Sequence, residues 1–120
     1  MEWAVEVALE FGLPVAATMC IGPGGDEGGV SVGECAVRMA RAGAHIVGTN
    51  CLFDPYTILE VTAEMKSALD KCGLAPYLMA QPNGYRIPDG GSQVGNRNVE
   101  IESDLNLLIC LSPHNIIRDG

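Results

Sequence analysis

Three short apolar runs recur about every 30 residues along the chain, and this recurrence constrains the fold more than any other feature. They begin near residues 15, 45 and 77, each has the length of a strand, and none alternates apolar with polar side chains. Strands of this kind are typical of parallel sheets, so we expect both faces of each strand to be buried. With helical segments between the runs, the order is α-β-α-β-α-β, the repeat of a parallel α/β fold.

Two architectures share this repeat, a doubly wound sheet and a partial (β/α)8 TIM barrel. A whole barrel takes about 250 residues, so a chain of 120 residues would hold less than half of one, about three β/α units. The repeat breaks after residue 85. Residues 83–98 are rich in glycine, asparagine and proline and are predicted to form a loop, and the apolar run at 105–111 is compatible with a strand or a short helix.

The ends of the helices are marked by capping residues. Ser31 followed by Glu34 matches the capping box, and Asp54-Pro55 supplies an N-cap and a proline at the first helical position. A glycine follows each of the three predicted helices, at positions 12, 43 and 73. The first helix, residues 2–11, has no N-cap residue before it, so we expect the chain to begin inside an element that once started earlier.

The composition excludes several classes of partner. Fifteen acidic residues against seven basic ones give a net charge of −8, which disfavours both a nucleic acid and an anionic membrane surface. No apolar run reaches the roughly 18–20 residues of a membrane span, and no signal peptide is visible. The five cysteines are odd in number and widely spaced without a C-x-x-C pair, so we expect free thiols and a cytoplasmic protein.

Candidate site residues lie where the predicted strands end, because ligands of parallel α/β folds bind at the carboxyl ends of the strands. Cys51 ends the second strand, directly after the polar residues Thr49 and Asn50. Cys20 ends the first strand in the same way, so position alone does not separate the two cysteines. A free cysteine is often a small buried hydrophobic residue, and by position alone that interpretation of Cys51 is favoured.

Other residues are more simply structural. Cys35 and Cys72 lie on the apolar stripes of predicted helices and are interpreted as core cysteines. His45 begins a strand, at the end opposite the expected site. The glycine-rich loop at residues 22–30 matches no phosphate-binding motif, and its two acidic residues would repel a phosphate.

Five stretches together resemble a known family. They are PVAATMCIGP at residues 14–23, GECAVR at 33–38, AGA at 42–44, GTNC followed by FDP within 48–55, and LMAQP at 78–82 with Tyr85, Pro88 and Asp89 beyond it. These stretches are similar to the betaine–homocysteine S-methyltransferases, within the wider family of homocysteine-binding methyltransferases. The resemblance covers about residues 3–89, and the surrounding residues favour the betaine branch over the cobalamin branch.

The resemblance implies a (β/α)8 barrel in which residues 1–89 match strands five to seven and residues 90–120 form a divergent tail. It implies zinc held by three cysteines. Cys51 would be the first of them, and the other two lie side by side in a later Gly-Gly-Cys-Cys strand that this sequence lacks. Asn50 is implied in substrate binding. The reaction would transfer a methyl group from betaine to homocysteine and form methionine.

Two hypotheses therefore stand. The first is a fragment of a zinc-dependent homocysteine S-methyltransferase, with homocysteine and betaine as partners; because one cysteine cannot build the zinc site, we expect the isolated chain to be inactive. The second is a non-catalytic α/β binding module that uses its three strands as a small independent sheet. The sequence assigns no oligomeric state.

Overall fold

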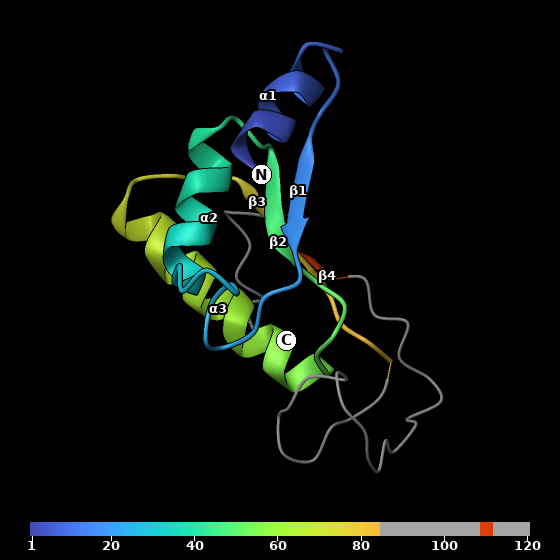
Figure 1. Ribbon diagram of the computed structural model, residues 1–120, viewed down its shortest axis with the longest axis vertical. Coiled ribbons are helices and arrows are strands. Elements are labelled where there is room, and N and C mark those ends of the chain that lie inside the picture. The colour runs from blue at the N-terminus through green and yellow to red at the C-terminus, as the bar shows by residue number, and fades with distance from the viewer. Residues whose placement is uncertain (85–108, 112–120) are drawn as a thin grey trace, which may run out of the picture.

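Helices and strands alternate along the part of the chain that the computed structural model describes, residues 1–84 and 109–111. The elements are α1 (Glu2–Leu9), β1 (Ala16–Met19), α2 (Val32–Arg41), β2 (Ile46–Asn50), α3 (Pro55–Lys71), β3 (Tyr77–Gln81) and β4 (Ile109–Leu111). The four strands form one sheet in the order β1-β2-β3-β4, and the helices pack against it (Figure 1). β1, β2 and β3 are parallel, and β4 is antiparallel to β3. The predicted α/β fold with three parallel strands is confirmed, and residues 109–111 of the apolar run in the tail form a strand.

The helix caps follow the sequence closely. The Ser31 side chain accepts a hydrogen bond from the Glu34 amide at 3.2 Å, and the Asp54 carboxylate accepts one from the Thr57 amide at 2.8 Å. Pro55 is the first residue of α3, as predicted. The first helix was predicted over residues 2–11 and ends two residues sooner, because the chain turns after Leu9. The remaining 90–120 tail, apart from 109–111, lies outside the described residues.

The core lies between the sheet and the layer formed by α2 and α3. On the strands it contains Val47 and Leu78, and on the helices its largest fully buried side chains include Met39, Met65 and Leu69. On β2, Val47, Gly48 and Thr49 are buried in succession, so the prediction that both faces are buried is confirmed for the centre of this strand. On β1 and β3 no two successive residues are buried, so the prediction is wrong for these two strands among the described elements. Because these strands are apolar on both faces, their sequence does not reveal which face the helices cover.

The face of the sheet opposite α2 and α3 carries candidate site residues at its carboxyl end. Strand register pairs Met19 with Thr49, which places Cys20 beside Asn50 at the carboxyl end of this face. The buried hydroxyl of Thr49 donates a hydrogen bond to the Ile21 carbonyl at 3.2 Å and thereby joins the ends of β1 and β2. In the part of the chain that the structure describes, no helix is long and apolar enough to cross a membrane.

Gly48, in the centre of the sheet, allows an unusually close approach of β2 and β3. A Cβ atom at this position would lie 1.9 Å from the Met79 carbonyl oxygen and 2.8 Å from its carbonyl carbon. Both are backbone atoms, so a side chain here requires the two strands to separate. Gly48 is therefore required by strand packing and not by chain flexibility.

Candidate functional site

Two cysteine sulfurs meet at the carboxyl ends of β1 and β2. The side-chain Nδ2 of Asn50 donates hydrogen bonds to Cys20 Sγ at 3.2 Å and to Cys51 Sγ at 3.1 Å. We call these three residues the thiol cluster. Cys20 and Cys51 are both exposed free thiols, so the cluster is open to solvent. The structure thus brings the predicted site residues Asn50 and Cys51 together and adds Cys20, which the sequence placed at a strand end without assigning it a role.

The backbone at the end of β2 is strained where it presents Cys51. Cys51 and Leu52 have φ values of +56° and +58°, in the left-handed region that costs non-glycine residues about 1–2 kcal/mol each. Side chains of a continuing strand would alternate between faces. The left-handed turn instead allows the Cys51 sulfur to return to the amide of its neighbour Asn50. Consecutive strained residues of this kind concentrate at functional sites, where the surrounding structure holds them.

Neighbouring backbone groups hold this turn in place. The Cys51 amide donates to the Gln81 carbonyl of β3 at 2.9 Å, and the Phe53 amide donates to the Cys51 carbonyl at 2.7 Å. The Asn83 amide, beyond β3, donates to the Phe53 carbonyl at 3.0 Å. The loop after β2 is therefore fixed to the segment that follows β3, and the position of Cys51 depends on the pairing of the two strands.

The loops around the cluster also pack tightly. A Cβ atom at Gly22 would lie 2.3 Å from Cζ of the Phe53 ring, so the ring lies directly on the glycine that follows β1. The buried Nδ2 atom of Asn83 has no hydrogen-bond partner within the described part of the chain. Sequence reasoning missed Asn83, although its position just after the third strand is the signal that could have found it.

The electrostatics of the two described strand-end thiols are linked. The pKa of Cys20 is raised, first by desolvation of its sulfur and then by the charge of Cys51 and a side-chain hydrogen bond with it. The hydrogen bond from Asn50 acts in the opposite direction and favours the thiolate. Cys20 is therefore a protonated thiol near neutral pH, and a thiophilic cation would have to displace its proton.

Of the three residues that the sequence predicted to be structural, two are confirmed and one is not. Cys35 is 4% exposed and belongs to the core, as predicted. His45 is structural, since its Nδ1 accepts a hydrogen bond from the Val15 amide at 3.1 Å. The prediction of a core position for Cys72 is wrong, because Cys72 is exposed. It is the C-cap of α3, one turn beyond the buried Leu69, where the helix has passed the edge of the core.

The predicted loop at residues 22–30 closes on its own backbone. The Asp26 carboxylate accepts a hydrogen bond from the Val30 amide at 2.8 Å, and the Asp26 amide donates to the Val30 carbonyl at 2.9 Å. The carboxylate is thus used to shape the loop. This arrangement agrees with the interpretation of the segment as a connection and not as a phosphate site.

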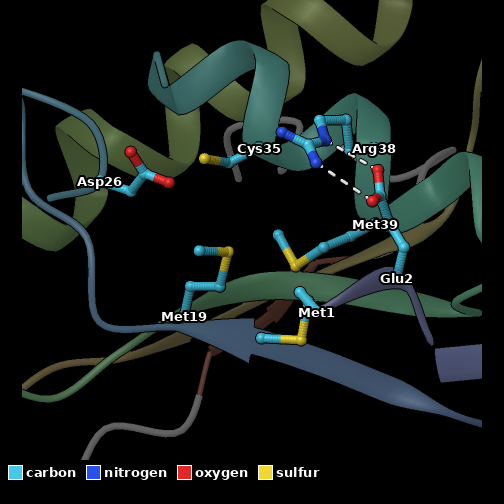
Figure 2. Close-up of a pocket in the computed structure, with 7 residues that line it drawn as sticks. All are labelled: Met1, Glu2, Met19, Asp26, Cys35, Arg38 and Met39. Atoms are coloured by element: carbon cyan, nitrogen blue, oxygen red, sulfur yellow. Dashed lines mark hydrogen bonds and ion pairs between the residues drawn. The ribbon is translucent and has the colours of Figure 1, made fainter. Parts of the chain in front are cut away.

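A cavity of about 150 Å³ lies between α1, α2 and the end of β1 (Figure 2). The side chains that line it are Met1, Glu2, Met19, Asp26, Cys35, Arg38 and Met39. Arg38 makes a two-pronged ion pair with Glu2 at 2.7 and 3.1 Å. This pair lowers the pKa of Glu2, chiefly through the side-chain hydrogen bond. The Arg38 and Glu2 charges neutralise each other, and the Cys35 thiol donates to the Val30 carbonyl. These polar groups are therefore already used within the protein, and the cavity is a weaker candidate for a functional site than the thiol cluster.

The thiol cluster is the best candidate for binding a metal. Thiolate sulfur suits thiophilic cations such as Zn²⁺, and a catalytic zinc site usually takes three protein ligands. Within residues 1–84, no three histidine, cysteine or acidic side chains come together in a metal-binding arrangement. The donor chemistry of the cluster therefore fits zinc, with fewer protein ligands than a complete catalytic site has.

Comparison with known proteins gives strong matches over most of the chain. The chain is 55% identical over 92 residues to betaine–homocysteine S-methyltransferase 1 of Danio rerio, a match that covers 77% of this chain and 23% of the relative. It is 56% identical over 91 residues to the enzyme of the same name from Mus musculus, covering 76% and 22%. It is also 56% identical over 89 residues to S-methylmethionine–homocysteine S-methyltransferase of Rattus norvegicus, covering 74% and 24%. No family model matches the chain.

The chain spans about a quarter of the length of these relatives. Within that span, more than half of the aligned residues are identical. The resemblance expected from the sequence motifs is confirmed, and it is a resemblance of a partial chain.

Proposed function

We propose, from this confirmed resemblance to the betaine–homocysteine S-methyltransferases, that the chain is part of a zinc-dependent homocysteine S-methyltransferase. The reaction would move a methyl group from betaine to the sulfur of homocysteine, giving methionine and dimethylglycine. The proposal rests on the sequence identity of 55–56% between this chain and enzymes whose names state homocysteine methylation. In this proposal the three parallel strands are part of a (β/α)8 barrel, and residues 1–89 are the partial homocysteine-binding barrel.

The position of Cys51 supports the proposal. In (β/α)8 barrels, active sites lie at the carboxyl ends of the strands, and Cys51 is an exposed thiol immediately after β2. Its strained backbone and its link to Gln81 hold the thiol in one place. A ligand fixed in this way loses little conformational freedom when it binds a metal.

Cys51 would hold zinc, and Asn50 would position the sulfur groups around it. When bound, zinc lowers the pKa of a coordinated thiol and so supplies a sulfur nucleophile at neutral pH. Asn50 Nδ2 already donates to both cysteine sulfurs, so its side chain is oriented toward the place where a substrate thiol would bind. We assign its carbonyl oxygen to accept a hydrogen bond from the substrate.

We propose betaine as the methyl donor. The names of the relatives state two donors, betaine and S-methylmethionine, at nearly equal identity to this chain. Both donors carry the methyl group on a positively charged atom, nitrogen or sulfur. In either case the homocysteine sulfur forms the new bond to carbon while the donor's bond breaks, and the neutral amine or thioether leaves with the electron pair.

We also propose a reducing, cytoplasmic location. The support is chemical: the described cysteines 20, 35, 51 and 72 are all free thiols, and three of them are exposed. Exposed thiols persist in a reducing compartment and are oxidised outside it.

A chimeric enzyme tests the proposed function. The 92 residues of the Danio rerio enzyme that match this chain would be replaced by the corresponding residues of this chain. We expect the purified chimera to form methionine from homocysteine and betaine, and we expect Cys51→Ser to abolish both activity and zinc content. Cys72→Ser is the matched control, because Cys72 is also an exposed free thiol but lies at the end of α3.

The chimera also gives the outcome against the proposal. A folded chimera that binds zinc as tightly with Cys51→Ser as without it would exclude Cys51 as a ligand. The 120-residue chain alone should form no methionine, because a complete barrel requires about 250 residues. Methionine formation by the purified 120-residue chain would contradict this part of the proposal.

A further inference from the structure

The side chain of Asn83 contains a polar atom that the proposed function leaves without a role. Its Nδ2 atom is buried and has no hydrogen-bond partner within the described part of the chain. Nearly all buried polar atoms of proteins are hydrogen-bonded, and a buried donor without a partner lowers the stability of the unbound protein. Violations of this kind concentrate at functional sites, where the missing partner belongs to a ligand.

Asn83 lies at the same end of the sheet as the thiol cluster. It follows the last residue of β3 by two positions, and β3 pairs in parallel with β2, so both strands end at one edge. Its backbone amide donates to the Phe53 carbonyl at 3.0 Å, and the Phe53 amide donates to the Cys51 carbonyl at 2.7 Å. The backbone of Asn83 is therefore anchored to the loop that presents Cys51, without any use of its side-chain amide.

The basic side chains of residues 1–84 lie elsewhere. They are Arg38 and Arg41 on α2, and Lys66 and Lys71 on α3. Arg38, Arg41 and Lys71 lie in the last turns of their helices, which lead into β2 and β3 and so lie toward the amino ends of the strands. Arg38 and Lys66 are each paired with an acidic residue. Within this part of the chain, an anionic group at the carboxyl ends of the strands therefore relies on neutral N–H donors.

We propose that Asn83 Nδ2 donates a hydrogen bond to the carboxylate of a substrate, which makes Asn83 a substrate-binding residue. This inference rests on the proposed function, whose two substrates, homocysteine and betaine, each carry a carboxylate. A carboxylate oxygen is a strong acceptor because it is charged, and one such bond strengthens binding about ten- to hundredfold. The carboxylate takes no part in the methyl transfer, so the bond is equally strong before and during the reaction. It therefore lowers KM and leaves kcat unchanged.

Kinetics of the chimeric enzyme test this role. Asn83→Leu removes the donor and keeps a side chain of similar size. We expect KM for one of the two substrates to rise at least tenfold, with kcat within twofold of the parent value. KM for homocysteine and KM for betaine would be measured separately, each with the other substrate at saturation, so the affected substrate is the one whose carboxylate Asn83 binds.

Two further variants of the chimera control this measurement. Asn83→Gln keeps an amide donor and should recover part of the lost affinity. Tyr77→Phe is the matched control, because it removes one polar group from the amino end of β3, the strand that Asn83 follows. Tyr77 is 49% exposed, and its replacement by Phe should leave both KM values unchanged.

Thermal unfolding of the 120-residue chain distinguishes substrate binding from a structural role. Without substrate, the Asn83 donor has no partner, so an apolar side chain of similar size removes an unfavourable buried group. Asn83→Leu should therefore melt at the temperature of the parent chain or above it. A residue that serves only the fold would lose a hydrogen bond in this variant, and the chain would melt at a lower temperature.

The outcomes separate this inference from the proposed function. Unchanged KM values for both substrates in the folded Asn83→Leu chimera overturn the inference and leave the methyltransferase assignment intact. A variant chain that melts about 4 °C or more below the parent also overturns it, because Nδ2 then has a partner within the protein. A chimera that forms no methionine with Asn83 in place overturns the proposed function, and this inference with it. A higher KM for one substrate, at unchanged kcat and melting temperature, supports the inference.

Discussion

Replacement of Gly48 by alanine should be the most damaging single-methyl change in the described sheet. The new Cβ would lie 1.9 Å from the Met79 carbonyl oxygen, whereas ordinary contact begins at 3.4 Å. Overpacking of a core costs about 1–3 kcal/mol, and the upper end applies because the obstructing atoms belong to the backbone of β3 and cannot rotate away. At about 4 °C per kcal/mol for a chain of this size, the melting temperature should fall by about 12 °C.

Thermal unfolding followed by circular dichroism at the helix band measures this effect. Gly24→Ala is the matched control, because nothing lies within 4 Å of a Cβ at Gly24 and its backbone is not left-handed. The control should melt within about 2 °C of the parent chain, as surface substitutions usually do. If Gly48→Ala melts as the control does, the close approach of β2 and β3 is not present in solution and the structural reasoning fails.

Substitutions at three further positions test separate parts of the structure. Met65→Ala should cost about 2–5 kcal/mol, measured by the denaturant midpoint, because it opens a cavity in the centre of the core; Met65→Leu should cost less than about 1.5 kcal/mol. Thr49→Val should cost about 1–3 kcal/mol in the same assay, because it leaves the Ile21 carbonyl without its buried donor. Glu2→Gln removes a carboxylate whose pKa Arg38 holds below the ordinary value of 4.5. The Glu2 contribution is present above that pH and is lost as the pH falls through the lowered pKa, so parent and variant should differ slightly in melting temperature at neutral pH and converge in acid; a difference that grows in acid would contradict this sign.

The periodic elements of the fold could be predicted because local chemistry determines them. The cap of α2 at Ser31 and that of α3 at Asp54 each satisfy a backbone amide at the helix start, and a hydrogen bond of this kind depends on residues only three positions apart. The third strand was predicted to begin near residue 77, and in the structure it spans Tyr77–Gln81, where Pro76 and Pro82 limit it on both sides.

The thiol cluster could be predicted only in part, because it depends on contacts between distant segments. The motif at residues 48–51 identified Cys51 and Asn50, but the pairing with Cys20 follows from the register of β1 against β2. Register between parallel strands is set by packing across the whole sheet and has no local signal. The left-handed backbone at Leu52 is equally invisible in the sequence, since leucine is an unfavourable residue for that conformation.

The position of the Cys51 thiol also depends on contacts between distant segments, namely on the pairing of β2 with β3. The strained turn is held by the hydrogen bond from the Cys51 amide to the Gln81 carbonyl, and that bond exists only while β2 and β3 stay paired. Gly48→Ala separates these strands and touches neither cysteine of the cluster. We therefore expect it to release the turn and to lower the zinc content of the chimeric enzyme, even at temperatures where the helices remain folded. Unchanged zinc content in a destabilised Gly48→Ala chimera would show that the turn holds itself, and that the pairing of β2 with β3 is not what positions the thiol.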